Sequence, residues 1–239
     1  MIRLTIDGRE IETEPGHTIL EVAREHRLPI PTLCYHEALE PFAACRMCVV
    51  EVEAGRGRQL VASCAYPCAD GLVVYTASDA VLQSRRMTVE LLMASAAHVP
   101  LIRAMAEELG VTTPRFVMEK DDCILCGLCV RACHEIVGVG AISVINRGIE
   151  KKVSPPFHIA SNVCIECGTC VLVCPTGAIT LADITGGVQT VHPWESEFEA
   201  VDCRVCGHHD LAPQFADHAT LLAEPALTPS GQVKGEAVP

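Results

Sequence analysis

The sequence is poor in aromatic side chains and in long apolar runs. Aromatic residues make up 4% of the 239 residues, and the formal net charge is −12. The longest apolar candidate, Val89 to Leu101, is interrupted by Glu90 and His98, so we expect no membrane span. A nucleic-acid-binding face is normally basic, and we therefore expect no nucleic-acid partner for this acidic chain.

The usual fingerprints of nucleotide binding are also missing. No G-x-G-x-x-G follows a predicted strand, and no Walker A loop is present. No flavin or nicotinamide site, and no active site of the chain's own, is evident from the sequence, and whether the chain is itself an enzyme stays open. Residues 1–8 lack the apolar segment of a signal peptide, which predicts a cytoplasmic protein with reduced cysteines.

Cysteine, in contrast, is abundant, with fifteen in the chain. Eight of them repeat the spacing C-x2-C-x2-C-x3-C in residues 123–133 and 164–174, and Pro175 follows the second copy. Three cysteines at this step wrap one tight loop, so their sulfurs can face three corners of a cubane cluster. A zinc site has no use for the third cysteine, and disulfide frameworks are typical of short secreted chains. The spacing predicts two [4Fe-4S] clusters.

The fourth cysteine of each run serves the opposite cluster in two-cluster ferredoxins. On that pattern, the predicted ligands of one [4Fe-4S] cluster are Cys123, Cys126, Cys129 and Cys174. Those of the other are Cys164, Cys167, Cys170 and Cys133. The two loops have Gly127 and Gly168 at equivalent places, where a residue without a Cβ lets backbone amides approach inorganic sulfur.

The N-terminal region has the pattern of a hairpin followed by a helix. Residues 2–14 alternate between apolar and polar side chains around the turn signal Asp7-Gly8. Thr18 and Glu21 form the capping box of a helix that follows. Strand patterns recur at residues 47–53 and 72–76. This order is similar to that of a β-grasp ferredoxin.

A second group of cysteines follows this helix with the spacing C-x10-C-x2-C-x15-C. The spacing is close to that of plant-type ferredoxins, although its first gap is longer. It predicts a [2Fe-2S] cluster with the ligands Cys34, Cys45, Cys48 and Cys64. A zinc site would not explain the preceding hairpin and helix. Cys68 could compete for the fourth position, but the spacing favours Cys64 and predicts a buried free thiol at Cys68.

Together these motifs resemble the iron–sulfur electron-input arm of NADH dehydrogenase, the 75 kDa-type subunit. A similar arm occurs in the small diaphorase subunit of NAD-reducing hydrogenases, and at the front of some formate dehydrogenases and iron-only hydrogenases. The run from Gly138 to Ser143 is similar to the last two. The resemblance covers residues 1 to about 185. It implies an electron-relay subunit between a flavin/NAD(H)-binding subunit and a catalytic metal-containing subunit.

One element of that family is missing from the sequence. The family usually has a middle cluster in the motif H-x3-C-x2-C-x5-C, and His98 stands at its histidine position. The three cysteine positions are occupied by Ile102, Met105 and Val111. Isoleucine and valine cannot ligate iron, so we expect this cluster to be absent and His98 to be a helix-end residue.

Residues 78–115 are instead predicted to form two helices. Ser78 is the expected N-cap of the first, and the second follows Pro100. The first helix is predicted to direct five side chains inward: Val81, Leu82, Val89, Leu91 and Leu92. Short strands and a loop around Pro155-Pro156 are expected between the cysteine runs, and residues 178–181 resemble a closing strand.

The C-terminal region has a further pair of cysteines. Cys203 and Cys206, with His208 and His209, form half of a metal site, and His218 or a partner subunit could complete it. Zinc and a further iron–sulfur cluster are equally open, and a chance pair of thiols is the alternative. Beyond Ala223 the composition is typical of a flexible tail.

These patterns predict an α+β chain in four parts. They are a β-grasp [2Fe-2S] ferredoxin domain in residues 1–77, a helical spacer in 78–115, a bacterial-type two-cluster [4Fe-4S] ferredoxin domain in 116–185, and a C-terminal extension in 186–239. The expected function is electron relay within a multisubunit NAD(P)-linked oxidoreductase, a hydrogenase, formate dehydrogenase or related complex. The alternative is a redox-sensing or scaffold module with a C-terminal zinc site.

Overall fold

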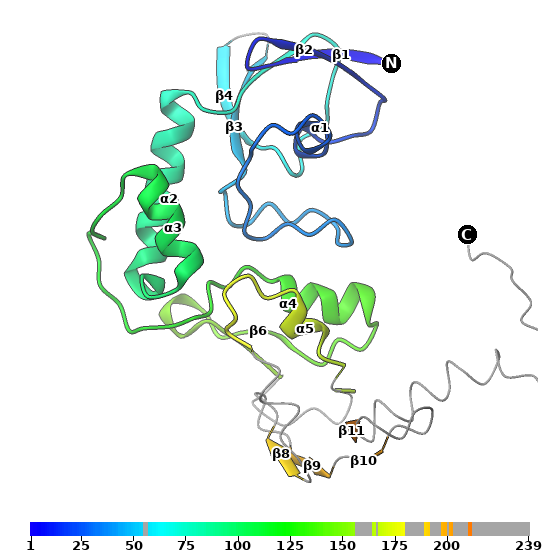
Figure 1. Cartoon of the computed structure of the whole chain (residues 1–239), viewed down its shortest axis with the longest axis vertical. Helices are drawn as coiled ribbons and strands as arrows, with labels where there is room; N and C mark the ends of the chain where they lie inside the picture. Colours follow the sequence, from blue (N-terminus) through cyan, green and yellow to red (C-terminus); the bar gives the residue numbers. More distant parts are fainter. Residues whose placement is uncertain are drawn as a thin grey trace, which may run out of the picture. The chain divides into compact units, whose positions relative to one another are not determined.

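The computed structural model describes residues 1–54, 57–155, 164–165 and 167–179, together with the backbone of four short strands further on (Figure 1). Those strands are β8 Gln189–Val191, β9 Glu197–Glu199, β10 Val201–Asp202 and β11 Asp210–Leu211. Contacts divide the chain into two compact units, Met1–Leu128 with Val173–Ala178, and Cys129–Leu172 with Ile179–Pro239. Among the described residues, no helix has the length and apolar character needed to span a membrane.

A five-stranded mixed sheet forms the N-terminal part of the first unit, in the order β2-β1-β5-β3-β4. Its strands are β1 Ile2–Ile6, β2 Arg9–Thr13, β3 Val49–Ala54, β4 Gly57–Ala62 and β5 Leu72–Tyr75. β1 and β5 are parallel, and all other neighbours are antiparallel. The predicted hairpin is confirmed as β1 and β2. The sequence pattern does not predict β4, because its first four side chains are all exposed.

Helix α1, Ile19–Glu25, begins at the predicted capping box. The Glu21 amide donates to Thr18 Oγ1 at 3.3 Å, and the Thr18 amide donates to Glu21 Oε2 at 2.7 Å. The buried face of α1 packs against β1 and β5 in one apolar core. Each aliphatic side chain fully buried there contributes about 1.5–3 kcal/mol, so the sheet and α1 have a stable core of their own.

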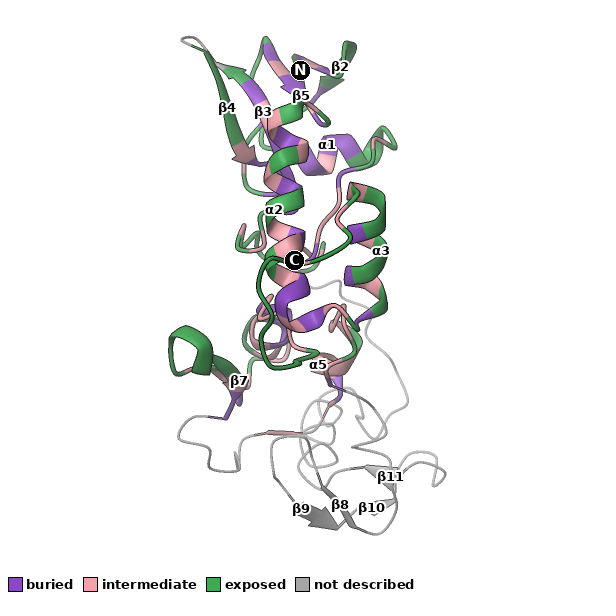
Figure 2. Cartoon of the chain, turned by 90° about the vertical axis from the view of Figure 1, so that its left-hand side faces the viewer, coloured by how far each residue is buried: buried purple, intermediate pink, exposed green. Residues whose placement is uncertain are grey.

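Helices α2, Asp79–Ala96, and α3, Pro100–Leu109, are the two helices predicted for residues 78–115, and they pack together as a helical hairpin. The Ser78 cap is confirmed, since its Oγ accepts from the Val81 amide. Figure 2 shows buried positions recurring along α2, and they include Val81 and Val89 as predicted. The prediction for Leu91 is wrong, because this side chain is 55% exposed. Steps of four residues lead along the buried stripe to Arg85, which the apolar pattern did not include.

The two helices share a second apolar core with the N-terminal cysteine loop. Val89 and Met93 of α2 and Ile102 of α3 pack there with Leu33 and Met47. The spacer helices are therefore packed onto the module that precedes them.

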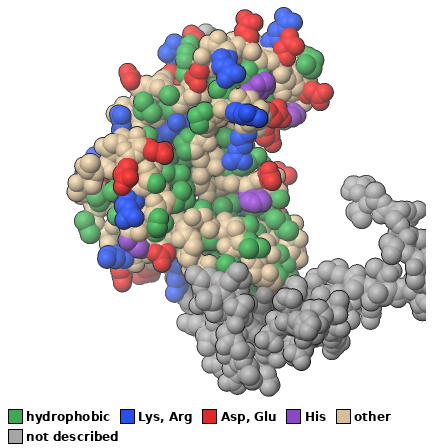
Figure 3. Space-filling model, in the orientation of Figure 1, with side chains coloured by type: hydrophobic (Ala, Val, Ile, Leu, Met, Phe, Trp, Pro, Cys, Tyr) green, Lys and Arg blue, Asp and Glu red, His purple; other side chains and the backbone are tan. Residues whose placement is uncertain are grey.

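On the face drawn in Figure 3, acidic and basic side chains are interspersed over the described residues.

The region of the doubled cysteine motif has only short elements. They are α4 Leu128–Arg131, the π-helical turn η1 Ala132–Ile136, β6 Ser143–Ile145, the 3₁₀ turn η2 Gly148–Glu150, β7 Lys152–Ser154 and α5 Thr169–Leu172. Antiparallel pairing of β6 with β7 confirms the predicted short strands. Pro156 and the predicted closing-strand residues Thr180 and Leu181 lie outside the described residues.

Candidate metal centres

The first centre lies at the open end of the β3–β4 hairpin, opposite its turn. Register pairs Val49 with Ala62, which brings the flanking Cys48 and Cys64 together with their Sγ atoms 3.4 Å apart. Cys34 is the third buried thiol here, and its Sγ accepts from the Cys45 amide at 3.4 Å. The structure thus brings together all four cysteines predicted for the [2Fe-2S] cluster.

These four thiols shift one another's pKa in two pairs. A hydrogen bond from Cys34 lowers the pKa of Cys45 to about 5, and the same contact raises the pKa of Cys34. The Cys64 contact likewise lowers the pKa of Cys48 to about 6 and raises that of Cys64. Iron would displace the thiol protons of both pairs, because it binds the thiolate form.

Backbone geometry at this centre also fits a cluster. Amides of Ala43, Ala44 and Met47 donate to cysteine sulfurs. The loop directs these amides inward through left-handed residues, Ala43 with φ 55° and Arg46 with φ 60°. Such N–H···S bonds stabilise the negative charge of thiolate-bound iron–sulfur groups.

Cys68 lies apart from this sulfur group. It is 9% exposed within the apolar core beside α1. Burial raises its pKa to about 11, with further contributions from Glu21 and Glu25 and none from a cysteine. This environment favours Cys64 over Cys68 as the fourth ligand.

The second centre is built on a linker fixed against α2. The Met118 amide donates to the Ala94 carbonyl at 2.8 Å, and Arg115 pairs with Glu90. His98 lies between α2 and α3, as predicted, and its Nε2 contacts Asp122 Oδ1 at 2.5 Å. These contacts hold the loop that begins at Cys123 against the helical hairpin.

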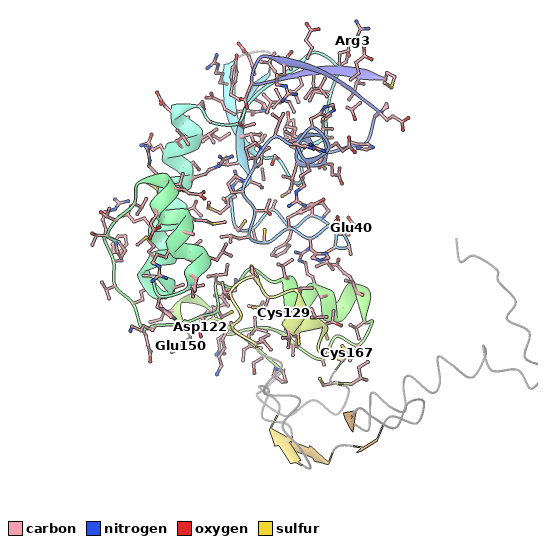
Figure 4. All side chains as sticks on the ribbon, in the orientation of Figure 1. Arg3, Glu40, Asp122, Cys129, Glu150 and Cys167 are labelled. Carbon is pink, nitrogen blue, oxygen red and sulfur yellow. The ribbon has the colours of Figure 1, made fainter. Side chains whose placement is uncertain are left out.

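Within this loop the thiols of Cys123 and Cys126 are partly buried, and burial raises the pKa of both. The nearby Cys174, from the second cysteine run, raises both pKa values further. The structure therefore brings Cys174 to the first run, as the crossed pattern predicts. Leu125 is left-handed, with φ 53°. Cys129, the fourth predicted ligand, is buried in α4 (Figure 4).

The third centre is an apolar cavity in the second unit. It is lined by all four cysteines predicted for the other cubane, Cys133, Cys164, Cys167 and Cys170. Burial raises the pKa of Cys170 to about 12, and the other three thiols add to this effect. Packing of α5 on η1 brings the two runs together, and the Ala141 amide donates to Cys133 Sγ at 3.3 Å.

Each centre offers the kind of donor that an iron–sulfur cluster uses. Thiols lie there with backbone N–H groups directed at their sulfurs, and thiolates are the soft ligands of such clusters. In the described part of the chain, no three His, Cys, Asp or Glu side chains are placed to hold one metal ion.

Within the first unit, one cavity is lined by a cysteine from each of the first two centres. Its volume is about 310 Å³, and Cys45 and Cys126 both line it, along with Leu92 of α2. Phe42 contributes a second link, because a Cβ built on Gly127 would lie 3.6 Å from Phe42 Cε1. Nothing in the sequence pattern indicated that Phe42, in the long first gap, contacts the cubane loop.

The three positions at which the family has the cysteines of a middle cluster are part of the second apolar core. Ile102 is fully buried, and Met105 and Val111 pack against the same core. The C-terminal candidates Cys203, Cys206, His208 and His209 lie outside the described residues, so a metal site there stays a prediction.

Family models match both cysteine-rich regions of the chain. A 2Fe-2S iron-sulfur cluster binding domain matches residues 1–79, and a 4Fe-4S dicluster domain matches residues 122–178. The predicted complement of one [2Fe-2S] and two [4Fe-4S] clusters is thereby confirmed at the level of domains.

Named relatives agree with these matches. The chain is 38% identical to the HndD subunit of the NADP-reducing hydrogenase of Solidesulfovibrio fructosivorans, over 75% of this chain and 36% of that protein. It is 32% identical to an NADH-quinone oxidoreductase subunit of Rhizobium meliloti, over 87% of this chain and 27% of that protein. The chain thus spans about a third of the length of these curated relatives.

A crystal structure of NAD+-reducing [NiFe]-hydrogenase in the H2-reduced state contains a similar chain. The TM-score is 0.57 at 32% identity, and the match covers 65% of this chain and 75% of the hydrogenase chain. The chain belongs to the family of iron–sulfur subunits in which a 2Fe-2S domain precedes a 4Fe-4S dicluster domain, and it is similar to chains of this hydrogenase and of NADH-quinone oxidoreductase.

Proposed function

We propose that this chain relays single electrons within an NAD(P)-linked oxidoreductase complex. A subunit that binds flavin and NAD(H) would stand at one end of the relay and a catalytic metal subunit, such as a hydrogenase, at the other. The relatives named for NADP-reducing hydrogenase and NADH-quinone oxidoreductase support this assignment. The cytoplasmic location predicted from the sequence is part of the same proposal.

The ligand sets of the proposal are those of the cysteine spacings. The [2Fe-2S] cluster of a β-grasp, plant-type domain would be held by Cys34, Cys45, Cys48 and Cys64. The cubanes of a bacterial-type ferredoxin domain would be held by Cys123, Cys126, Cys129 and Cys174, and by Cys164, Cys167, Cys170 and Cys133. Proximity of Cys174 to Cys123, and of Cys133 to Cys170, supports the crossed assignment.

The observation that carries the proposal is the cavity shared by Cys45 and Cys126. When loaded, the clusters would exchange electrons with little change in geometry. Cys45 of the flat centre and Cys126 of the first cubane line the same cavity, and Leu33, Leu92 and Ile124 contribute apolar side chains to its lining. We propose direct exchange between these two centres, without a middle cluster.

Reduction by NADH tests the relay. Anaerobically purified protein, together with its co-purifying flavoprotein, is mixed with NADH, frozen at short intervals and examined by electron paramagnetic resonance. We expect the signals of the reduced flat and cubane clusters to appear within one turnover. Clusters that dithionite reduces but NADH with the flavoprotein does not would contradict the relay, and would favour the redox-sensing or scaffold alternative.

A further inference from the structure

Arg85 is a buried cation beside the first centre. It lies on α2 and is 5% exposed, and no other Lys, Arg, Asp or Glu in the described residues is buried to this extent. Its Nε donates to the Met47 carbonyl at 3.0 Å, and its Nη2 donates to the Val49 carbonyl at 2.7 Å. These two carbonyls flank Cys48, so the guanidinium holds the backbone on both sides of a predicted ligand.

The charge of Arg85 has no carboxylate within ion-pair distance among the described residues. The acidic groups that act on it are Cys48 and, more weakly, Asp7. The Asp7 carboxylate is already engaged, because it accepts hydrogen bonds from the amide and hydroxyl of Thr76. A buried charge without a counter-charge is costly, and the thiolates of the first centre are the counter-charge at hand.

We infer that Arg85 is a positioning residue that fixes the Cys45–Cys48 loop and places a permanent positive charge beside the [2Fe-2S] cluster, which raises the reduction potential of that cluster. The inference rests on the proposed ligand set. Reduction adds one negative charge to the cluster, and a nearby cation in a poorly solvated site stabilises the reduced form more than the oxidised form. The two carbonyl bonds keep the cation in place during electron transfer.

Redox titration of three variants of the loaded chain tests this inference. Arg85→Gln removes the charge but keeps a hydrogen-bond donor, and Arg85→Lys keeps the charge. Arg86→Gln is the matched control, because Arg86 is the exposed neighbour on α2 and donates instead to the Leu109 carbonyl. Electron paramagnetic resonance at fixed potentials, set with mediators and dithionite, gives the midpoint of each cluster.

We expect Arg85→Gln to shift the [2Fe-2S] midpoint to a more negative potential and to leave the cubane midpoints unchanged. Arg85→Lys and Arg86→Gln should both stay at the wild-type value. An unchanged midpoint in Arg85→Gln, or an equal shift in Arg86→Gln, would overturn the inference. The titration needs neither NADH nor a partner, so its outcome is separate from the test of the relay.

Arg85→Gln could also fail to retain the flat cluster, since the loop loses part of its support. Arg85→Lys then decides the matter. Retention of the cluster at the wild-type midpoint supports the assigned charge. Loss of the cluster from both Arg85 variants but not from Arg86→Gln supports the positioning role of the two carbonyl bonds. A markedly lowered midpoint in Arg85→Lys overturns the assigned charge, because lysine carries the same charge.

Discussion

Residues 1–109 and 123–179 are built on different principles. The first region has a five-stranded sheet and three helices around two apolar cores. In the second, each described helix, turn or strand is three to five residues long. Apolar burial can stabilise the first region before iron binds, whereas bound clusters must supply much of the order in the second. One chain can therefore combine a module that folds around its own apolar core with a module whose order depends on bound metal.

Removal of iron should have the largest effect, and it should affect the two regions differently. We expect anaerobic chelation of all iron to abolish amide protection in residues 123–155 and 167–179, because thiolate–iron bonds there replace a large apolar core. Protection should persist in β1, β3 and β5. Hydrogen exchange read by mass spectrometry measures both regions in one sample, and equal loss in the two regions would contradict the distinction.

Removal of a single ligand should have the next largest effect. Cys64→Ser should abolish the [2Fe-2S] signal and leave the cubane signals intact, so that the iron content falls from about ten to about eight atoms per chain. Iron analysis and electron paramagnetic resonance measure this change. Cys68→Ser is the matched control and should keep all three clusters. Loss of the flat cluster from Cys68→Ser alone would reverse the ligand assignment.

A substitution in the second apolar core should have a smaller effect, and it tests whether apolar burial stabilises the first region. Ile102→Ala should lower the free energy of unfolding of the first region by about 2–5 kcal/mol, because it leaves a cavity between α3 and its core. Chemical denaturation followed by circular dichroism measures this loss. The control is Leu91→Ala on the exposed side of α2, for which we expect a change below about 1 kcal/mol. Similar losses for both would argue against the core described above.

The smallest expected effect concerns the reactivity of Cys68. Its pKa of about 11 lies above the ordinary thiol value of 9.0, so the neutral thiol dominates at pH 8. The thiolate is the reactive form, and alkylation should therefore accelerate about tenfold per pH unit until the pH approaches this pKa. Peptide mapping after timed alkylation of the loaded protein gives the rate. A rate that levels off near pH 9, as for an exposed thiol, would contradict the burial of Cys68.

The sequence predicts the elements whose signals are local. The Asp7-Gly8 turn, the Thr18–Glu21 capping box and the Ser78 cap each depend on a few neighbouring residues, and each is present. The cysteine spacings also predict which thiols meet, because a short loop leaves few alternatives. Contacts between residues far apart in the sequence leave no such local signal.

Arg85 and Phe42 illustrate what the sequence pattern misses. Arg85 lies on the buried stripe of α2, but a charged residue is normally read as solvent-exposed, and its carbonyl partners are more than thirty residues away. Phe42 meets Gly127 only through tertiary packing. Leu91, assigned to the core by its apolar character, is exposed because helix geometry and not hydrophobicity alone decides which face is covered.

The left-handed residues of the cysteine loops bear on how this protein would be repaired after oxygen damage. Ala43, Arg46 and Leu125 adopt a conformation that costs a non-glycine residue about 1 kcal/mol or more. Once iron is lost, each loop keeps only its protein contacts. Arg85 still holds the backbone next to Arg46, whereas the linker contacts with the helical hairpin, from Arg115, Met118 and Asp122, come before Leu125 in the chain. Rebuilding should accordingly be faster at the flat centre than at the first cubane.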